Sequence, residues 1–285
     1  MTKSREVAVA VPASLVSDVP HLREKTAKIG IVGRAACIFG VEEIIVYADQ
    51  QFKRQRRDAN LIATILSYLE TPQYLRKRLF KIRPELRYAG VLPPLRSRHH
   101  PLANRVGGLV DGEIREGAVV SVGRSGVLVD VGVDRDAFIR DANLRVGSRV
   151  TVALKKSKNS LEARVLKSSE IREYWGYHVT LSKLTLGKLL NDSSIDLVIG
   201  TSKYGKPFSE VQHELRDRMR DSRKVLVAFG APSQGLYQIA RREKIDLDSV
   251  ADFVINVFPF QEVETVRTEE AILVALGILR FLTKS

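Results

Sequence analysis

Three polar loops of the chain carry the residues best suited to chemistry. They occupy, in chain order, residues 200–202, 230–235 and 256–271. Each loop directly follows a short apolar run of the kind that forms a buried strand. Parallel strands end at a common edge of their sheet, and α/β proteins bind ligands at that edge. We therefore expect the three loops to converge and to form one binding site.

The groups in these loops are suited to a neutral ligand rather than a polyphosphate. None of the loops has a Gly-x-Gly-x-x-Gly or P-loop pattern, so a dinucleotide or triphosphate site is not expected. Ser202 and Ser233 lack a nucleophile-elbow setting, which argues against a hydrolase. What remains is backbone groups, hydroxyls, side-chain amides and apolar walls, which suit an adenine-like ring and a short zwitterion.

The sequence predicts no metal site. Cys37 is the only cysteine, so neither an intramolecular disulfide nor a cysteine zinc site can form. It lies in an apolar helical stretch, where a small core residue is expected rather than a nucleophile. His178 and His213 are isolated in the chain, and each is expected to be a surface residue rather than a metal ligand.

The third loop, residues 256–271, is the most specific of the three. Asn256 and Gln261 carry side-chain amides that both donate and accept hydrogen bonds. Pro259 fixes one φ angle and removes a donor. Thr268 is a favourable N-cap for the apolar helix that follows, and two glutamates then fall in the first turn, where the helix dipole favours negative charge.

Strands and helices alternate around these loops. Apolar runs of strand length occupy residues 7–11, 44–47, 195–199, 225–229 and 253–255. Helical spacing of apolar residues occupies residues 20–39, 58–69, 209–220, 236–242 and 272–282. This alternation predicts an α/β fold with a parallel sheet whose faces are covered by helices.

The pattern changes between Gly90 and residue 170. The run Leu-Pro-Pro-Leu at 92–95 breaks helix and strand alike. Short β-prone runs then follow at residues 117–122, 126–131, 137–139, 149–154 and 161–165. Five such strands predict a small β-barrel of the OB type, and a simple β-meander without a ligand is the alternative. The expected domains are two halves of the α/β domain, 1–91 and 171–285, with 92–170 as the inserted barrel.

The charge of the chain indicates a polyanionic partner. Its 285 residues include 46 Lys plus Arg and 33 Asp plus Glu, for a net charge of +13. Such an excess favours nucleic acid, and a merely basic protein is the alternative. A single basic cluster is more often a solvated face, whereas several clusters favour phosphate contact. The arginines expected to bind RNA are Arg54, Arg57, Arg76, Arg78, Arg96 and Arg98.

The sequence predicts a cytoplasmic protein. Lys3, Arg5 and Glu6 precede only a short apolar run, unlike the start of a signal peptide. The longest apolar run, near the C-terminus, is too short and too closely flanked by charge to span a bilayer. No membrane partner is therefore expected.

The three loops together resemble motifs of the SPOUT superfamily of RNA methyltransferases. The matching residues are Ile-Gly-Thr-Ser at 199–202, Gly-Ala-Pro at 230–232, and Asn-x-x-Pro-x-Gln followed by Thr-Val-Arg-Thr-Glu-Glu-Ala within 256–271. The chain is most similar to the archaeal and eukaryotic branch with an inserted OB-like domain, whose human member is described as an rRNA uridine-N3 methyltransferase. The resemblance covers nearly the whole chain, and the third motif is its most specific part.

This resemblance implies a fold, a cofactor and an oligomeric state. The C-terminal part would tie a trefoil knot whose loops hold S-adenosyl-L-methionine (SAM), mainly through backbone groups. The residues that it places around this cofactor are Thr201, Gly230, Asn256, Phe258, Gln261 and Thr268. Phe258 would either stack on the adenine or fill the core. A homodimer through the C-terminal helix is also implied, and a helix that is apolar around most of its circumference suits one. Burial of that helix inside the monomer is the alternative.

The expected function is that of a SAM-dependent RNA methyltransferase that acts, as a homodimer, on a uridine N3 of rRNA. Uracil N3 is a poor nucleophile until it loses its proton, so a base or an anion-stabilising cation would help. Arg267 is the candidate cation, unless it pairs with Glu264 or Glu270. Glu262 and Glu264 are weak candidates for the base. The alternative is a non-catalytic RNA-binding or ribosome-assembly protein that retains the fold.

Overall fold

The computed structural model describes residues 5–49, 52–157 and 160–284, with the side chains of 52–54 and 284 outside that description. The chain forms two compact units. The first, the sheet unit, contains the described residues up to Ser67, Glu85–Pro93 and those from Tyr177 onward. The second, the barrel unit, contains Tyr68–Pro84 and Pro94–Gly176. Helix α2 (Phe52–Glu70) begins in the first unit and ends in the second.

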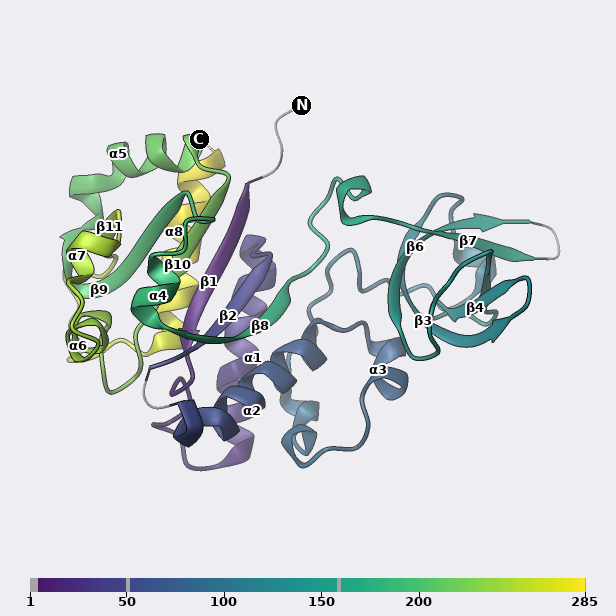
Figure 1. The fold of residues 1–285 in the computed structure, drawn as a ribbon, viewed down its shortest axis with the longest axis horizontal. Coiled ribbons are helices and arrows are strands. Elements are labelled where there is room, and N and C mark those ends of the chain that lie inside the picture. The colour runs from purple at the N-terminus through teal and green to yellow at the C-terminus, as the bar shows by residue number, and fades with distance from the viewer. Residues whose placement is uncertain (1–4, 50–51, 158–159, 285) are drawn as a thin grey trace. The chain divides into compact units, whose positions relative to one another are not determined.

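The sheet unit is built on six strands among its described residues (Figure 1). In chain order they are β1 (Glu6–Pro12), β2 (Glu43–Ala48), β8 (His178–Thr185), β9 (Leu197–Pro207), β10 (Lys224–Ala228) and β11 (Phe253–Asn256). Their spatial order is β11-β9-β10-β1-β2-β8, and every pairing between neighbours is parallel. The parallel α/β sheet that the sequence predicted is therefore confirmed.

Helices cover both faces of this sheet, because successive residues of a strand point to opposite sides. Alternate strand residues such as Ala10 and Leu226 join a core with three short helices. These helices are α4 (Leu186–Leu190), α6 (Leu236–Arg242) and α7 (Leu247–Val250). The strand residues that point to the other face of the sheet, such as Val7 and Val227, face a second group of helices. This group contains α1 (Leu22–Phe39), α5 (Phe208–Asp221) and α8 (Thr268–Lys284), and α8 packs against both others.

The local sequence explains how α1 and α8 end and pack. Helix α1 stops at Gly40, whose φ of 71° lies in the left-handed region that favours glycine. At Gly277 of α8, a Cβ atom would lie 3.3 Å from the ring of Phe39. The small residue therefore allows the end of α1 to approach α8 closely. None of the described helices has the length and apolar character needed to cross a membrane.

Two strands differ from the sequence prediction. Strand β8 lies at the edge of the sheet and is mostly exposed, so it carries no apolar run by which it could be recognised. Strand β9 was predicted to end before Gly200 but continues to Pro207. Its pairing with β11 is interrupted, since Val254 pairs with Gly200 whereas the next residue, Ile255, pairs with Lys206. Residues 201–205 are therefore extra residues in β9, and we call them the β9 bulge.

The barrel unit confirms the five short strands that the sequence predicted. They are β3 (Ile114–Gly123), β4 (Gly126–Asp130), β5 (Ala137–Arg140), β6 (Arg149–Lys156) and β7 (Leu161–Val165). They close into a barrel in the order β3-β4-β5-β7-β6, where the β5–β7 pairing is parallel and the other pairings are antiparallel. Apolar side chains such as Val127, Val129 and Val152 fill the interior. The unit also contains α3 (Gln73–Leu79), η3 (Val106–Gly108) and η4 (Ser168–Glu170).

Candidate functional site

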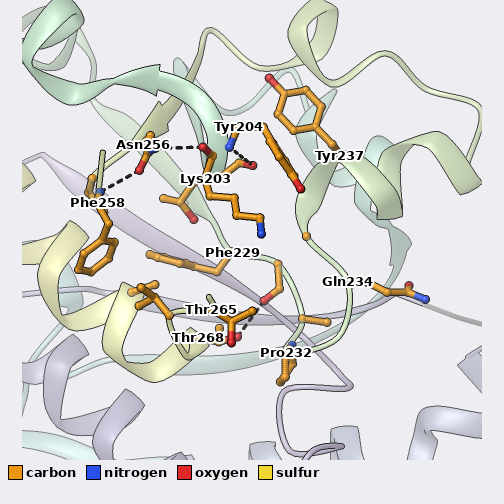
Figure 2. Close-up of a pocket in the computed structure, with 18 of the residues that line it drawn as sticks. Lys203, Tyr204, Phe229, Pro232, Gln234, Tyr237, Asn256, Phe258, Thr265 and Thr268 are labelled. Atoms are coloured by element: carbon orange, nitrogen blue, oxygen red, sulfur yellow. Dashed lines mark hydrogen bonds between the residues drawn. The ribbon is translucent and has the colours of Figure 1, made fainter. Parts of the chain in front are cut away.

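A pocket of about 260 Å³ lies in the sheet unit where β9, β10 and β11 reach their carboxyl ends (Figure 2). The three polar loops converge there, as the parallel order of the strands requires. All six residues that the sequence analysis placed around a cofactor line this pocket. They are Thr201, Gly230, Asn256, Phe258, Gln261 and Thr268.

The first wall of the pocket is the β9 bulge. The hydroxyl of Thr201 donates a hydrogen bond to Ala228 O on the neighbouring strand at 2.9 Å. Ser202 Oγ accepts from the backbone N–H of Tyr204 at 3.2 Å. Gly205 closes the bulge, where a Cβ atom would lie only 2.5 Å from Val254 O. The backbone of β11 leaves room for glycine alone at this position, which restrains the shape of the bulge.

The second wall is the loop between β10 and α6. Gly230 opens it, and a Cβ atom there would lie 2.9 Å from Gly235 Cα and 3.0 Å from Leu236 N. A tight turn follows, in which Ala231 and Gln234 exchange backbone hydrogen bonds of 2.8 and 3.3 Å. This close approach of backbone to backbone explains why the loop begins with glycine.

The third wall is the loop that follows β11. Asn256 spans its base: Asn256 Nδ2 donates to Lys203 O at 3.0 Å, and Asn256 Oδ1 accepts from Phe258 N at 2.8 Å (Figure 2). Gln261 Nε2 donates to Val263 O at 2.8 Å and to Glu264 O at 3.1 Å. Both side-chain amides therefore hold the loop in shape.

The prediction that Thr268 caps α8 is wrong. Thr268 is the first helical residue, and its hydroxyl donates to Gly230 O at 3.2 Å in the second wall. Arg267 holds the cap position instead, because its carbonyl accepts from Ala271 N at 2.9 Å. The carboxylate of Glu270 accepts from Arg267 N at 2.9 Å, which satisfies a free N–H at the helix start. Thr268 thus joins two of the three loops.

The chemistry of the lining is largely neutral. Of the described residues that line the pocket, Lys203 carries the one formal charge, and none is a carboxylate, an imidazole or a thiol. Tyr237 also lines the pocket, and its hydroxyl donates to Asp248 Oδ1 at 2.7 Å. Burial, together with this hydrogen bond, raises the pKa of Tyr237 to about 12. The site is therefore suited to binding and positioning a ligand rather than to acid–base chemistry with a built-in carboxylate.

The candidate catalytic residue Arg267 is not part of the lining. It is exposed and lies between two lining residues, Val266 and Thr268. Within the described chain, its guanidinium makes no ion pair with Glu264 or Glu270. Glu262 and Glu264 are also exposed and do not line the pocket. The structure therefore does not bring these charged side chains into the cavity.

The arginines predicted to bind RNA have different surroundings. Arg57 on α2 and Arg96 are exposed, whereas the side chain of Arg54 lies outside the described residues. Arg76 donates to Thr71 O and Leu69 O, at 2.8 and 2.9 Å, and lies over the ring of Tyr68. Arg78 pairs with Asp130 and Arg98 pairs with Glu173. Of these predicted arginines, Arg57 belongs to the sheet unit, whereas Arg76, Arg78, Arg96 and Arg98 belong to the barrel unit.

The lining also contains residues that were not predicted as site residues, among them Lys203, Tyr204, Phe229 and Tyr237. Lys203 and Tyr204 lie beyond the run that was predicted as a strand, because the polar run Thr-Ser-Lys-Tyr-Gly has no strand-like apolar pattern. The signal that could have identified them is Gly205 shortly before Pro207, since an isolated glycine in a strand indicates a bulge. Among the described residues, no group of three His, Cys, Asp or Glu could hold a metal ion.

Comparison with known proteins gives the family. Residues 6–279 match the model of a family described as “Putative RNA methyltransferase”. An uncharacterised protein of Halobacterium salinarum is 36% identical, over 98% of this chain and 99% of its own length. The 28S rRNA (uridine-N(3))-methyltransferases of Drosophila melanogaster and Homo sapiens are each 32% identical over 96% of this chain, and over 61% and 77% of their own lengths. This chain therefore belongs to that family of RNA methyltransferases.

Proposed function

We propose that this protein is a SAM-dependent methyltransferase that methylates N3 of a uridine in rRNA. The observation that carries the proposal is the pocket at the edge of the sheet, formed by three loops in a chain of the RNA methyltransferase family. The names of the fly and human relatives support rRNA as the substrate and uridine N3 as the methylated atom.

The residues of the pocket fit SAM. Its volume of about 260 Å³ is close to the lower end of the roughly 300–1,000 Å³ typical of small-molecule sites. Phe229 and Phe258 offer apolar walls for an adenine ring, and Thr201 and Thr268 offer hydroxyls. When bound, SAM supplies a methyl group that its sulfonium charge has already activated. A carboxylate beside that charge would stabilise the reactant more than the transition state, and the described lining contains none.

We also propose that the fold is of the SPOUT class with a trefoil knot. In this proposal residues 92–170 form an OB-like insertion between the two halves, 1–91 and 171–285, of the α/β domain. The parallel sheet and the closed five-stranded barrel support it, because they are the two parts that such an architecture requires. The six pocket residues would then hold SAM in the knot loops.

A homodimer through α1 and α8 is part of the proposal. The two helices pack against each other, and each exposes large apolar side chains, Ile31 and Ile38 on α1 and Leu273 and Phe281 on α8. Exposed apolar patches of this kind mark interaction surfaces. Substitution of Leu273 by Asp is expected to produce monomers in size-exclusion chromatography with light scattering. An unchanged monomeric mass in both proteins would contradict the dimer.

RNA contacts are proposed for the predicted arginines and for Arg267. The net charge of +13 supports binding to a polyanion, and Arg57 and Arg96 are exposed and in a position to contact phosphate. Arg267 is exposed beside the pocket lining, and we still predict that it contacts the target nucleotide. Affinity for RNA is expected to fall steeply as salt rises, and a salt-independent affinity would contradict phosphate recognition.

Calorimetric titration with SAM tests the proposed function. Saturable binding is expected, together with transfer of a radioactive methyl group to rRNA. The absence of binding at high micromolar SAM would leave the non-catalytic RNA-binding alternative. The product is identified by comparing modified nucleosides in rRNA from cells with and without the gene. Loss of N3-methyluridine is expected, and an unchanged nucleoside profile would contradict the proposed substrate.

A further inference from the structure

We propose that Lys203 and Tyr204, side by side on the β9 bulge, form the element that recognises the target base. In this proposal the Tyr204 ring stacks on the unstacked uracil, and the Lys203 ammonium stabilises the anion that forms when N3 loses its proton. The inference rests on the proposed function, because it assigns a substrate to the same pocket.

The backbone of the bulge holds both residues in a defined position. Lys203 O accepts from Asn256 Nδ2 at 3.0 Å, and Tyr204 N donates to Ser202 Oγ at 3.2 Å. Gly205 follows, in a place where a Cβ atom would collide with the backbone of Val254. The two side chains therefore project from a rigid base, and rigid elements position functional groups well.

The charge distribution of the pocket singles out Lys203. Its ammonium is the one formal charge among the described lining residues, and Figure 2 shows its side chain reaching into the pocket. A positive charge at this place attracts an anion, and no described carboxylate in the lining neutralises it. Arg267, the cation expected from the sequence, is absent from the lining. Lys203 is thus better placed to act on a base that enters the pocket.

Tyr204 has the surroundings of a stacking platform. The residue is 71% exposed although it lines the pocket, so its ring is not needed to fill the core. The Lys203 Nζ atom lies 5.3 Å from the centroid of the ring. Aromatic side chains that stack on unstacked bases are the usual means by which proteins hold single-stranded RNA. The Lys203 ammonium lies over this ring, so a base that stacks on Tyr204 would take its place there, and the flexible lysine chain could turn to hold the charge at the edge of the base.

The base is a better partner for this pair than the carboxylate of SAM. Both Lys203 and Tyr204 are exposed, which places them on the solvent side of the pocket, where a macromolecule must enter. Thr268 is buried and donates one hydrogen bond to Gly230 O, so this more enclosed part of the lining suits the cofactor. The pairing of an aromatic ring with a cation also matches a uracil anion, which is both flat and charged.

The chemical step balances with these groups. The N3–H proton of uracil leaves to solvent water at the open side of the pocket, and the electron pair stays on the ring. The N3 pair then forms a bond to the methyl carbon as the methyl–sulfur bond of SAM breaks, with its electrons going to sulfur. Lys203 remains an ammonium throughout and favours the anion electrostatically, so it takes no proton.

The test compares variants in the full-length protein with the transcript of an rRNA fragment that the wild type methylates. Lys203→Met removes the charge, and Lys206→Met is its control, because Lys206 is exposed on the same strand but does not line the pocket. Tyr204→Ala removes the ring and Tyr204→Phe retains it. SAM affinity is measured by calorimetry, and single-turnover rates are measured as a function of pH.

Lys203→Met is expected to slow methyl transfer by about 100-fold at neutral pH while SAM affinity stays unchanged. The loss should shrink as pH rises, because the uracil then ionises without help. Tyr204→Ala is expected to raise KM for RNA by about tenfold, with Tyr204→Phe close to wild type. A Lys203→Met variant that weakens SAM binding, or that transfers methyl at the wild-type rate, would overturn the proposal. A wild-type protein that does not bind SAM would overturn the proposed function itself.

Discussion

Asn256 at the end of β11 donates a hydrogen bond from Nδ2 to the carbonyl of Lys203 in the β9 bulge, at 3.0 Å. The same side chain accepts from Phe258 N at 2.8 Å, so it fixes two walls of the pocket at once. Asn256→Asp keeps the acceptor but loses the donor and turns a carboxylate oxygen toward the Lys203 carbonyl. We expect SAM affinity to fall about tenfold, since a polar group without its partner weakens a site by this order. Calorimetric titration measures the change.

The control for this variant is Asn104→Asp, because Asn104 is exposed, belongs to the barrel unit and does not line the pocket. Its SAM affinity should equal that of the wild type. Neither Asn256 hydrogen bond is fully buried, since one is exposed and the other part-buried, so the melting temperature of Asn256→Asp should stay close to that of the wild type. Equal SAM affinity in the wild type and Asn256→Asp would show that this bond does not shape the pocket.

Gly205 gives a prediction about stability. A Cβ atom there would lie 2.5 Å from Val254 O and 2.7 Å from Val254 C, and neither backbone atom can move without disturbing β11. Gly205→Ala is expected to lower the free energy of unfolding by about 2 kcal/mol and to weaken SAM binding. Gly90→Ala is the control, because no atom lies within 4 Å of the added methyl group. Urea unfolding followed by circular dichroism measures the free energy of unfolding. Equal stability of Gly205→Ala and Gly90→Ala would contradict the prediction.

Much of this site could be predicted from the sequence because its parts are local. The apolar runs identify β10 and β11, and the parallel order then requires the loops that start at Gly230 and Asn256 to meet. The strands of the barrel were found for the same reason, since each has its own β-prone run ended by turn residues. The loop positions of the six cofactor candidates follow from this convergence, but their contacts do not.

The parts that could not be predicted depend on residues far apart in the chain. The pairing of β9 with β11 decides that Lys203 and Tyr204 lie in a bulge, and Lys203 is 53 residues away from the Asn256 that holds it. Thr268 has a good capping residue type, yet its hydroxyl turns to Gly230, 38 residues away. Strand β8 has no apolar run because it lies exposed at the sheet edge. Such contacts are set by tertiary packing rather than by local pattern.

A charge network in the barrel unit provides a prediction independent of the pocket. Arg149 donates to both carboxylate oxygens of Glu70, at 2.6 and 2.9 Å, and to Glu116 Oε2 at 2.5 Å. Arg149→Ala leaves two buried carboxylates without this partner. We expect a loss of about 3 kcal/mol in the free energy of unfolding, the usual cost of removing one partner of a buried pair. Trp175, the only tryptophan, donates to Glu116 at 2.6 Å, so its fluorescence reports on the unfolding of this unit.

Arg164→Ala is the matched control for Arg149→Ala. Arg164 pairs with Glu170 at the surface of the same unit, where an ion pair contributes less than about 1 kcal/mol. Equal losses of unfolding free energy in Arg149→Ala and Arg164→Ala would contradict the account of the buried network.

The network also responds to acid. Burial alone would raise the pKa of Glu70, but hydrogen bonds from His99 and Arg149 outweigh it and lower the pKa. The stabilisation by Glu70 is therefore present above its unfolded pKa and is lost as pH falls through its folded pKa.

The pairing of Glu43 with His178 makes stability depend on pH near neutrality. The two residues face each other across β2 and β8, with His178 Nε2 at 3.2 Å from Glu43 Oε1. The hydrogen bond with Glu43 raises the pKa of His178, and the same bond lowers the pKa of Glu43. The contribution of His178 is thus full below its unfolded pKa of about 6.5 and is lost as pH rises through the folded value. The contribution of Glu43 is lost only in acid, as pH falls through its lowered pKa.

His178→Gln should therefore destabilise the protein more at about pH 5.5 than at about pH 8.5. The difference is expected to be about 0.5 kcal/mol, because the imidazole is 63% exposed and solvent screens the pair. His213→Gln is the control, since His213 is exposed on α5 and forms no ion pair of 4 Å or less within the part of the chain that the structure describes. Urea unfolding at both pH values decides between a charged pair and a neutral contact. A His178→Gln effect that is the same at both values would mean that the imidazole contributes through a pH-independent hydrogen bond, and the raised pKa of His178 would then be wrong.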